Sequence, residues 1–236
     1  MTGCLEEGGE GHMTGRTAAH GDAWPGYRRT ARHDGLVPAL ALLCETVCDG
    51  VPPRGPGGHV VAPAGTAGTA GAAGAASGGA VTTLRVEGGT VVAWRSRAEP
   101  RDEPESPCAA WVLGLTCLRL GLSERLLDAV LAHLGGRTVG GAKLLHQQLV
   151  KGGVAEAVME QLEIETMLSG ATPGDLDDGV LAGLNAQITE TDRMLLRLLG
   201  AMSFLTDGPG QAARVSELIA DVYFGPAHAG EHGGAA

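Results

Sequence analysis

A few side chains in this sequence have the types and spacing needed for acid–base or metal chemistry. Cys44 and Cys48 are one helical turn apart and could supply half of a tetrahedral metal site, but no second His or Cys pair has the spacing to complete it. We therefore interpret them as buried structural thiols and predict no metal. His146 is a possible acid–base group because histidine is the residue type suited to proton transfer at neutral pH, although a lone helical His is more often a surface or packing residue. Phe224 cannot act as a base, because a phenyl ring has no lone pair to accept a proton. Asp221 is a carboxylate one helical turn before Phe224.

Composition places the chain among ordinary globular proteins. Its 236 residues fit one domain with a small appendage, and the core must consist of Leu, Val and Ala, since 44% of residues are hydrophobic and only 3% aromatic. The formal net charge of −10 argues against nucleic acid as a partner, and no window is apolar enough for a membrane span. The N-terminus lacks a signal-peptide pattern and the five cysteines are scattered, so we predict a cytoplasmic protein with reduced thiols.

The front of the chain reads as weakly structured. Residues 1–34 are polar and rich in Gly, His and Arg, and we predict that they are disordered. Met13 opens a repeat of the first three residues, so either Met1 or Met13 is the translation start. Residues 35–107 are expected to hold a remnant helix, Gly-rich linkers and a β-hairpin. The predicted pieces are a helix at 35–49, a Gly/Ala linker at 62–80, hairpin strands at 81–86 and 90–94, and a charged linker at 101–107.

The remainder of the chain changes to long apolar stripes at helical spacing. These stripes predict four helices between residues 108 and 226, followed by a flexible tail at 227–236. The stripes run from Val112 to Leu134, Leu145 to Met167, Leu184 to Met202 and Val215 to Val222. Short connections between amphipathic helices indicate a mainly α protein built on a four-helix up-down bundle.

Residues 111–226 resemble the C-terminal helical-bundle domain of the acyl-CoA dehydrogenase family. Residues 121–128 (GLSERLLD) match a signature of the first bundle helix in that family. Residues 137–141 (RTVGG) match its Arg-x-x-Phe-Gly turn, with Gln148 following, and residues 197–204 (RLLGAMSF) match the end of its third helix. Further family-like positions without a gap are Thr206, Asp207, Pro209, Tyr223 and Gly225. The resemblance implies a truncated, degenerate member, because the chain is too short for the family's three domains.

The resemblance also implies that the catalytic group of the family is missing. The family's last helix closes on a Glu that removes the α-proton of the substrate, and Phe224 stands in its place. Some members carry the base on the first bundle helix, at a position that corresponds to Trp111, and residues 109–116 contain no acid. We therefore predict no catalytic residue in this chain.

Four polar side chains are predicted to contact a cofactor. In the family, the Arg of the turn contacts the diphosphate of an FAD bound mainly by a neighbouring subunit, which assigns this role to Arg137. Its guanidinium is a rigid fork of donors that fits phosphate oxygens. Thr138 and Gln148 follow Arg137 in the chain and are the next predicted cofactor contacts. Arg197 stands where the family has a Gln in its third helix. The alternative for Arg137 is a cation that merely suits the C-terminus of its helix.

Two functions follow from the resemblance. The first is a non-dehydrogenating structural or partner subunit, forming a homo-oligomer or a hetero-oligomer with a full-length acyl-CoA dehydrogenase. The shortened front end is then expected to leave apolar bundle surface exposed for assembly. The alternative is an FAD-dependent oxidoreductase that acts on acyl-CoA or carrier-bound acyl substrates with a base supplied elsewhere. A plain interaction module without ligand is a third class.

Overall fold

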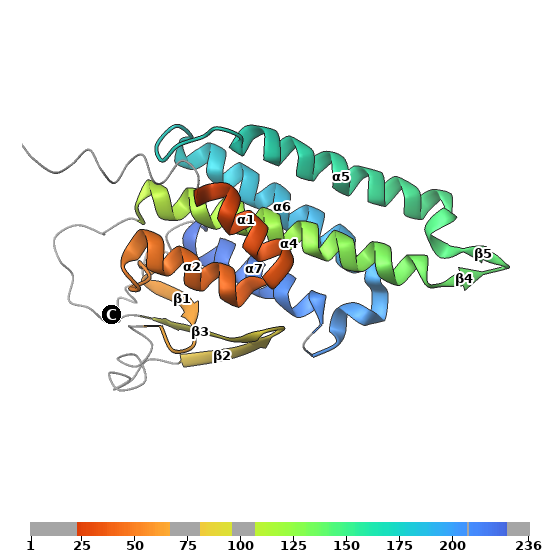
Figure 1. Ribbon diagram of the computed structural model, residues 1–236, viewed down its shortest axis with the longest axis horizontal. Helices are drawn as coiled ribbons and strands as arrows, with labels where there is room; N and C mark the ends of the chain where they lie inside the picture. The colour runs from red at the N-terminus through yellow and green to blue at the C-terminus, as the bar shows by residue number, and fades with distance from the viewer. Residues whose placement is uncertain (1–22, 67–80, 96–106, 207, 226–236) are drawn as a thin grey trace, which may run out of the picture.

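The computed structural model describes residues 23–66, 81–95, 107–206 and 208–225. The fold is mainly helical and is organised around one long helix, α4 (Ala109–Gly135), which contacts every other α-helix described (Figure 1). Every residue of α4 from Trp111 to Glu124 is buried, so this helix forms the axis of the protein. None of the described helices is long and apolar enough to cross a membrane.

The predicted four-helix bundle is confirmed. Its other members are α5 (Gln148–Leu168), α6 (Asp178–Leu199) and α7 (Pro209–Tyr223). The connections are a small hairpin of β4 (Thr138–Val139) and β5 (Ala142–Lys143), the 3-10 turn η1 (Leu144–His146) and the 3-10 turn η2 (Gly200–Phe204). Local signals set the helix ends: Asp177 caps α6 by accepting a hydrogen bond from the Val180 N–H, and Pro209 begins α7.

The front of the chain differs from the prediction, since two helices precede the bundle. The predicted helix is α2 (Leu36–Cys48), but α1 (Ala23–Asp34) lies in the segment expected to be disordered. Its buried side chains Trp24, Tyr27 and Ala31 form one narrow stripe against α4. A polar helix of this kind is stable only when that stripe finds a partner surface, which local sequence does not reveal. Residues 1–22 lie outside the described part.

The predicted hairpin is part of a larger sheet. Strands β2 (Val81–Val86) and β3 (Gly89–Arg95) form the hairpin, and β1 (His59–Pro63) adds to the other edge of β3, giving the antiparallel order β1-β3-β2. Val61 of β1 pairs with Ala93 of β3 and is fully buried. The start of the predicted Gly/Ala linker is thus a strand, because three consecutive residues of β1 pack into the core. Residues 67–80 and 96–106, where the rest of both predicted linkers falls, are outside the described part.

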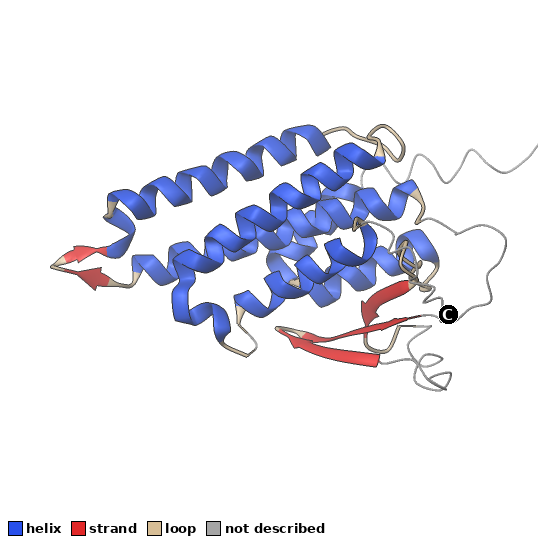
Figure 2. Cartoon of the chain, turned by 180° about the vertical axis from the view of Figure 1, so that it is seen from behind, coloured by secondary structure: helices blue, strands red, loops and turns tan. Residues whose placement is uncertain are grey.

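The apolar core is divided between the two ends of α4. The larger cluster joins α1, α2, the sheet and the N-terminal half of α4 to the C-terminus of α7, while the smaller cluster surrounds the C-terminal half of α4. Figure 2 shows the three-stranded sheet beside the helices, away from the small β4–β5 hairpin. Gly121 permits a close approach of α1 to α4, since a Cβ atom there would lie 2.1 Å from the Arg28 carbonyl oxygen. The front end therefore covers α4, contrary to the expectation that this bundle face is exposed.

Candidate functional site

The two residues predicted to stand at the family's base positions, Trp111 and Phe224, lie in and against the larger core cluster. Phe224 is the C-cap of α7, where its N–H donates to the Ala220 carbonyl at 2.8 Å, and its half-buried ring packs against the cluster. Trp111 is fully buried at the N-terminus of α4, and its ring meets that of Tyr223 edge-on with centroids 5.6 Å apart. Aromatic packing thus occupies both positions.

The titratable groups in this cluster are held in their neutral forms. The Tyr223 hydroxyl donates to the Pro53 carbonyl at 3.1 Å and accepts from the Val61 N–H at 3.3 Å, so it ties α7 to the front of the chain. Burial raises the pKa of Tyr223 well above its ordinary value and raises the pKa of the Cys44 thiol to about 12. Neither group can accept a proton near neutral pH. Asp221 is exposed on α7.

The predicted cofactor contacts lie at the opposite end of the bundle. Arg137 and Thr138 follow the C-terminus of α4, Gln148 begins α5, and Arg197 is in the last turn of α6 (Figure 1). All four side chains are exposed. Since α4 has 27 residues, about 40 Å separates this end from Trp111.

These four side chains offer donors but do not enclose a cofactor site within the part of the chain that the structure describes. The Arg137 guanidinium lies 3.3 Å from the His133 ring nitrogen one turn back on α4 and otherwise faces solvent. An exposed guanidinium, hydroxyl and amide fit the edge of a phosphate group held mainly by another molecule. Any FAD that met these residues would therefore be shared across an interface, and the role of the four residues stays a prediction.

Sequence inspection missed a polar network in the centre of the bundle. Arg119 on α4 is fully buried, and burial lowers the pKa of its guanidinium to about 10. It donates to Ser216 at 3.0 Å, to the Asn185 side chain at 2.6 Å and to Thr189 at 2.8 Å. The network joins α4, α6 and α7. A charge within the otherwise apolar run 111–122 was the sequence signal that pointed to it.

Asp192 is the anionic counterpart of this network. Burial raises its pKa to about 7, while a hydrogen bond from Ser123 and the charge of Arg119 favour the carboxylate. One carboxylate oxygen, Oδ1, is buried without a hydrogen-bond partner in the described structure. Asp192 continues the apolar stripe of α6 between Ile188 and Leu195, which is the pattern of a buried polar residue in a helix seam.

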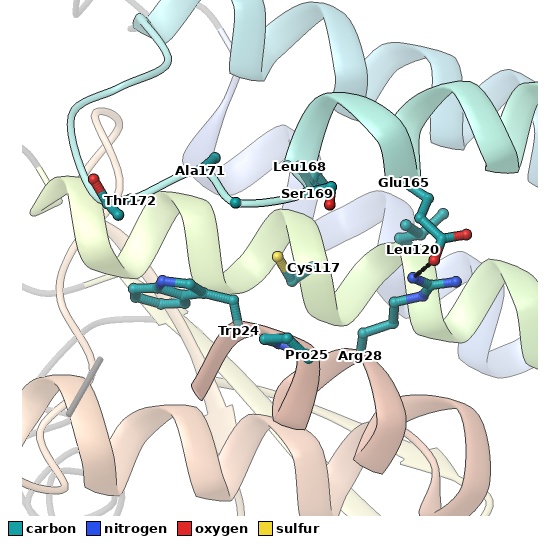
Figure 3. A pocket seen from close by; sticks show the side chains of 11 residues that line it. Trp24, Pro25, Arg28, Cys117, Leu120, Glu165, Leu168, Ser169, Ala171 and Thr172 are labelled. Atoms are coloured by element: carbon teal, nitrogen blue, oxygen red, sulfur yellow. Dashed lines mark hydrogen bonds and ion pairs between the residues drawn. The ribbon is translucent and has the colours of Figure 1, made fainter. Parts of the chain in front are cut away.

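A pocket of about 260 Å³ lies between α1, α4 and the C-terminus of α5 (Figure 3). Arg28 lines one side and forms ion pairs with Glu124 and Glu165, so its charge is compensated. Cys117 also lines the pocket, and burial raises the pKa of its thiol to about 12. The pocket therefore presents neutral or neutralised groups, which makes it poorly suited to nucleophilic or acid–base chemistry.

The remaining candidates from the sequence are placed as follows. His146 is exposed in η1. Cys44 is fully buried as expected, but Cys48 is only half-buried and its thiol hydrogen-bonds to Cys108 at the start of α4. Within the described residues, no group of three His, Cys, Asp or Glu side chains could hold a metal ion. The expectation that Cys44 and Cys48 form one buried pair is therefore wrong for Cys48.

Known proteins share little sequence with this chain. No family model and no curated protein matches it. Among solved structures, a chain of the ChsE4–ChsE5 complex from Mycobacterium tuberculosis is similar to it, with a TM-score of 0.45 and 19% sequence identity. The similarity covers 62% of this chain and 46% of that chain, so it extends over less than half of the other protein's length.

Proposed function

We propose that this chain is an acyl-CoA dehydrogenase-like protein that does not dehydrogenate and that acts as a structural or partner subunit of a flavoprotein assembly. The observation that carries the proposal is the packing of Phe224 and Trp111, the two residues at the family's base positions, into one apolar cluster. A dehydrogenase of this class needs a carboxylate there to remove the α-proton. Here the same space is filled by rings.

The surroundings of these positions support the loss of proton abstraction. Tyr223 and Cys44, the titratable neighbours within the cluster, keep their protons near neutral pH because of burial. Loss of a general base costs about 10²- to 10⁴-fold in rate. A substrate acyl chain would also have to displace the close contact between Trp111 and Tyr223.

The placement of the cofactor candidates supports a role in an assembly. Arg137 is about 40 Å from Trp111, so one flavin cannot meet both ends of the same chain. A diphosphate at Arg137 would have to be held by another subunit, whose own substrate pocket is elsewhere. This chain would then complete a neighbour's cofactor site without carrying out chemistry at its own.

The outer face of α5 is our proposed assembly surface. Val158, Met159 and Leu162 lie within about 100° of one another around the helix axis, and 38%, 65% and 54% of their surfaces are exposed. Helix α5 is at the edge of the bundle, where it contacts α4 and α6 (Figure 1). Exposed apolar side chains gathered on one helix face mark an interface. A stable interface would bury about 1,200–2,000 Å² in total.

The catalytic part of the proposal is tested by turnover assays on the purified full chain with added FAD and a panel of acyl-CoA substrates. We expect no dehydrogenation above background and protein without flavin colour when it is purified alone. Phe224→Glu restores the family's residue and serves as the comparison. Robust turnover by the unmodified protein would overturn the proposal. Yellow protein with turnover would favour the alternative, an FAD-dependent oxidoreductase.

The assembly part is tested by sedimentation at micromolar concentration, alone and with full-length acyl-CoA dehydrogenases encoded nearby. We expect a species heavier than the 23.9 kDa monomer. Leu162→Glu should dissociate it, whereas Lys151→Glu, an exposed position on the same helix, should not. Arg137→Ala should leave assembly intact but release flavin from a coloured complex. A chain that sediments as a monomer and binds none of these dehydrogenases would contradict the proposal.

A further inference from the structure

Two cysteines that are 60 positions apart in sequence meet at the junction of α2 and α4. Cys48 is the last residue of α2, and Cys108 is the N-cap residue of α4. Their thiols are free, and each perturbs the pKa of the other. The side chain of Leu43 on α2 lies against Gly114 on α4, so the end of α2 is packed against the beginning of α4. Cys108 is exposed and Cys48 is half-buried, so reagents can reach this pair, in contrast to the buried Cys44 and Cys117.

The position of Cys108 at a helix N-terminus favours its thiolate. The hydrogen bond from Cys48 contributes most, and with the first-turn N–H groups of Ala110 and Trp111 it lowers the pKa of Cys108 to about 6. The Cys108 side chain accepts no capping hydrogen bond, and the Trp111 N–H donates to the Cys108 carbonyl at 2.9 Å, so the first turn acts on the thiol through its electric field. The same contact raises the pKa of Cys48 far above its ordinary value, since Cys48 acts as the donor. The positive end of a helix dipole favours an anion at such a position.

We propose that Cys48 and Cys108 form a peroxide-reactive dithiol in which Cys108 is the attacking thiolate and Cys48 is the resolving thiol. The oxidant is a hydroperoxide. An exposed thiolate with a second thiol in contact is the arrangement that cysteines oxidised reversibly share. The proposal does not depend on flavin binding or on the family resemblance.

The reaction balances in two steps. The Cys108 sulfur attacks one oxygen of the peroxide, an S–O bond forms as the O–O bond breaks, and the departing oxygen takes up a proton and leaves as water or alcohol. Cys108 is then a sulfenic acid. The Cys48 sulfur attacks this sulfur, the S–S bond forms as the S–O bond breaks, and the released hydroxide leaves as water with the proton of Cys48. Two electrons pass from the two thiols to the peroxide.

The disulfide would join the end of α2 to the beginning of α4. This bridge closes the chain segment that contains the three-stranded sheet. It would constrain the unfolded chain and fix the front helices against the bundle. Oxidised protein should therefore unfold at a higher denaturant concentration than reduced protein.

The first test uses the unmodified full chain and needs no variant. Fully reduced protein is treated with a small excess of hydrogen peroxide, and its peptides are mapped by mass spectrometry without reduction. We expect one intramolecular Cys48–Cys108 disulfide that thiol reductants reverse. Alkylation by iodoacetamide at pH 7 should label Cys108 about tenfold or more faster than Cys48. A protein that stays reduced, or that forms only intermolecular bonds or bonds to Cys4, would overturn the proposal.

Single variants then assign the two roles. Cys48→Ala should accumulate sulfenic acid at Cys108, trapped by a dimedone probe, whereas Cys108→Ala should give neither sulfenic acid nor disulfide. Cys44→Ala lies one turn earlier on α2 and keeps both reacting thiols, so it is the matched control and should behave like the unmodified chain. Circular dichroism verifies that each variant is folded. Sulfenic acid on Cys48 in the Cys108→Ala variant would refute the assignment of roles.

Discussion

Replacing Asp192 with Asn should stabilise the protein, and the gain should grow with pH. Burial raises the pKa of Asp192 from 3.8 to about 7, although Ser123 and Arg119 favour the carboxylate; Glu217 disfavours it. Between about pH 4 and pH 7 the folded protein therefore holds a proton that the unfolded chain has released, so the free energy of unfolding falls as the pH rises through this window. A difference of about three units between the folded and unfolded pKa values lowers the free energy of unfolding by about 4 kcal/mol once both states are ionised. Asn has nearly the same shape and cannot ionise.

The assay is urea unfolding followed by circular dichroism at several pH values from 5 to 8. The free-energy difference between Asp192→Asn and the unmodified chain should be about 2–3 kcal/mol larger at pH 8 than at pH 5. Taking the difference removes the titration of other groups, Cys108 among them. Asp221→Asn, at an exposed position on α7, is the matched control. A difference for Asp192→Asn that does not vary with pH would refute the reasoning.

Three further substitutions test how the front of the chain is attached to the bundle. Gly121→Ala places a Cβ atom 2.1 Å from a backbone oxygen of α1 and should lower the free energy of unfolding by about 1–3 kcal/mol. Gly183→Ala on α6, where nothing lies within 4 Å of the added Cβ atom, is the control. It should be neutral or stabilising in the same urea titration. Tyr223→Phe leaves a buried N–H of β1 without its acceptor and should lower the free energy of unfolding by about 1–2 kcal/mol; an unchanged value would mean that the hydroxyl does not tie α7 to β1. Arg28→Ala leaves Glu124, which is only 7% exposed, without its main ion-pair partner. We expect the free energy of unfolding to fall by about 1–3 kcal/mol. If this loss disappears in high salt, the Arg28–Glu124 pair behaves as a solvent-exposed ion pair.

The sequence alone determined the helical bundle, and the prediction that a catalytic base is missing also rests on the sequence alone. Apolar residues repeat at helical spacing along α4, α6 and α7, and this periodicity is a local property of each segment. The stripe predicted for α5 is wrong, since Leu149, Val158 and Leu162 are exposed, whereas Ala157, Ile164 and Leu168 form the buried face. The hairpin of β2 and β3 was equally local, since alternating β-branched residues flank a Gly-Gly turn. The prediction that Phe224 stands in the place of an acid comes from the family resemblance and from residue type, and it needs no knowledge of the fold.

Only the tertiary structure decided where the front of the chain packs and which charged groups and thiols lie close together. Helix α1 has a polar sequence with three buried side chains, and the surface of α4 around Gly114 and Gly121 is what that stripe covers. The pKa of Asp192 and the contact between Cys48 and Cys108 depend on burial and on neighbours far away in sequence. Periodicity reports what a segment prefers by itself, whereas these features arise from contacts that exist only after the segments have packed together.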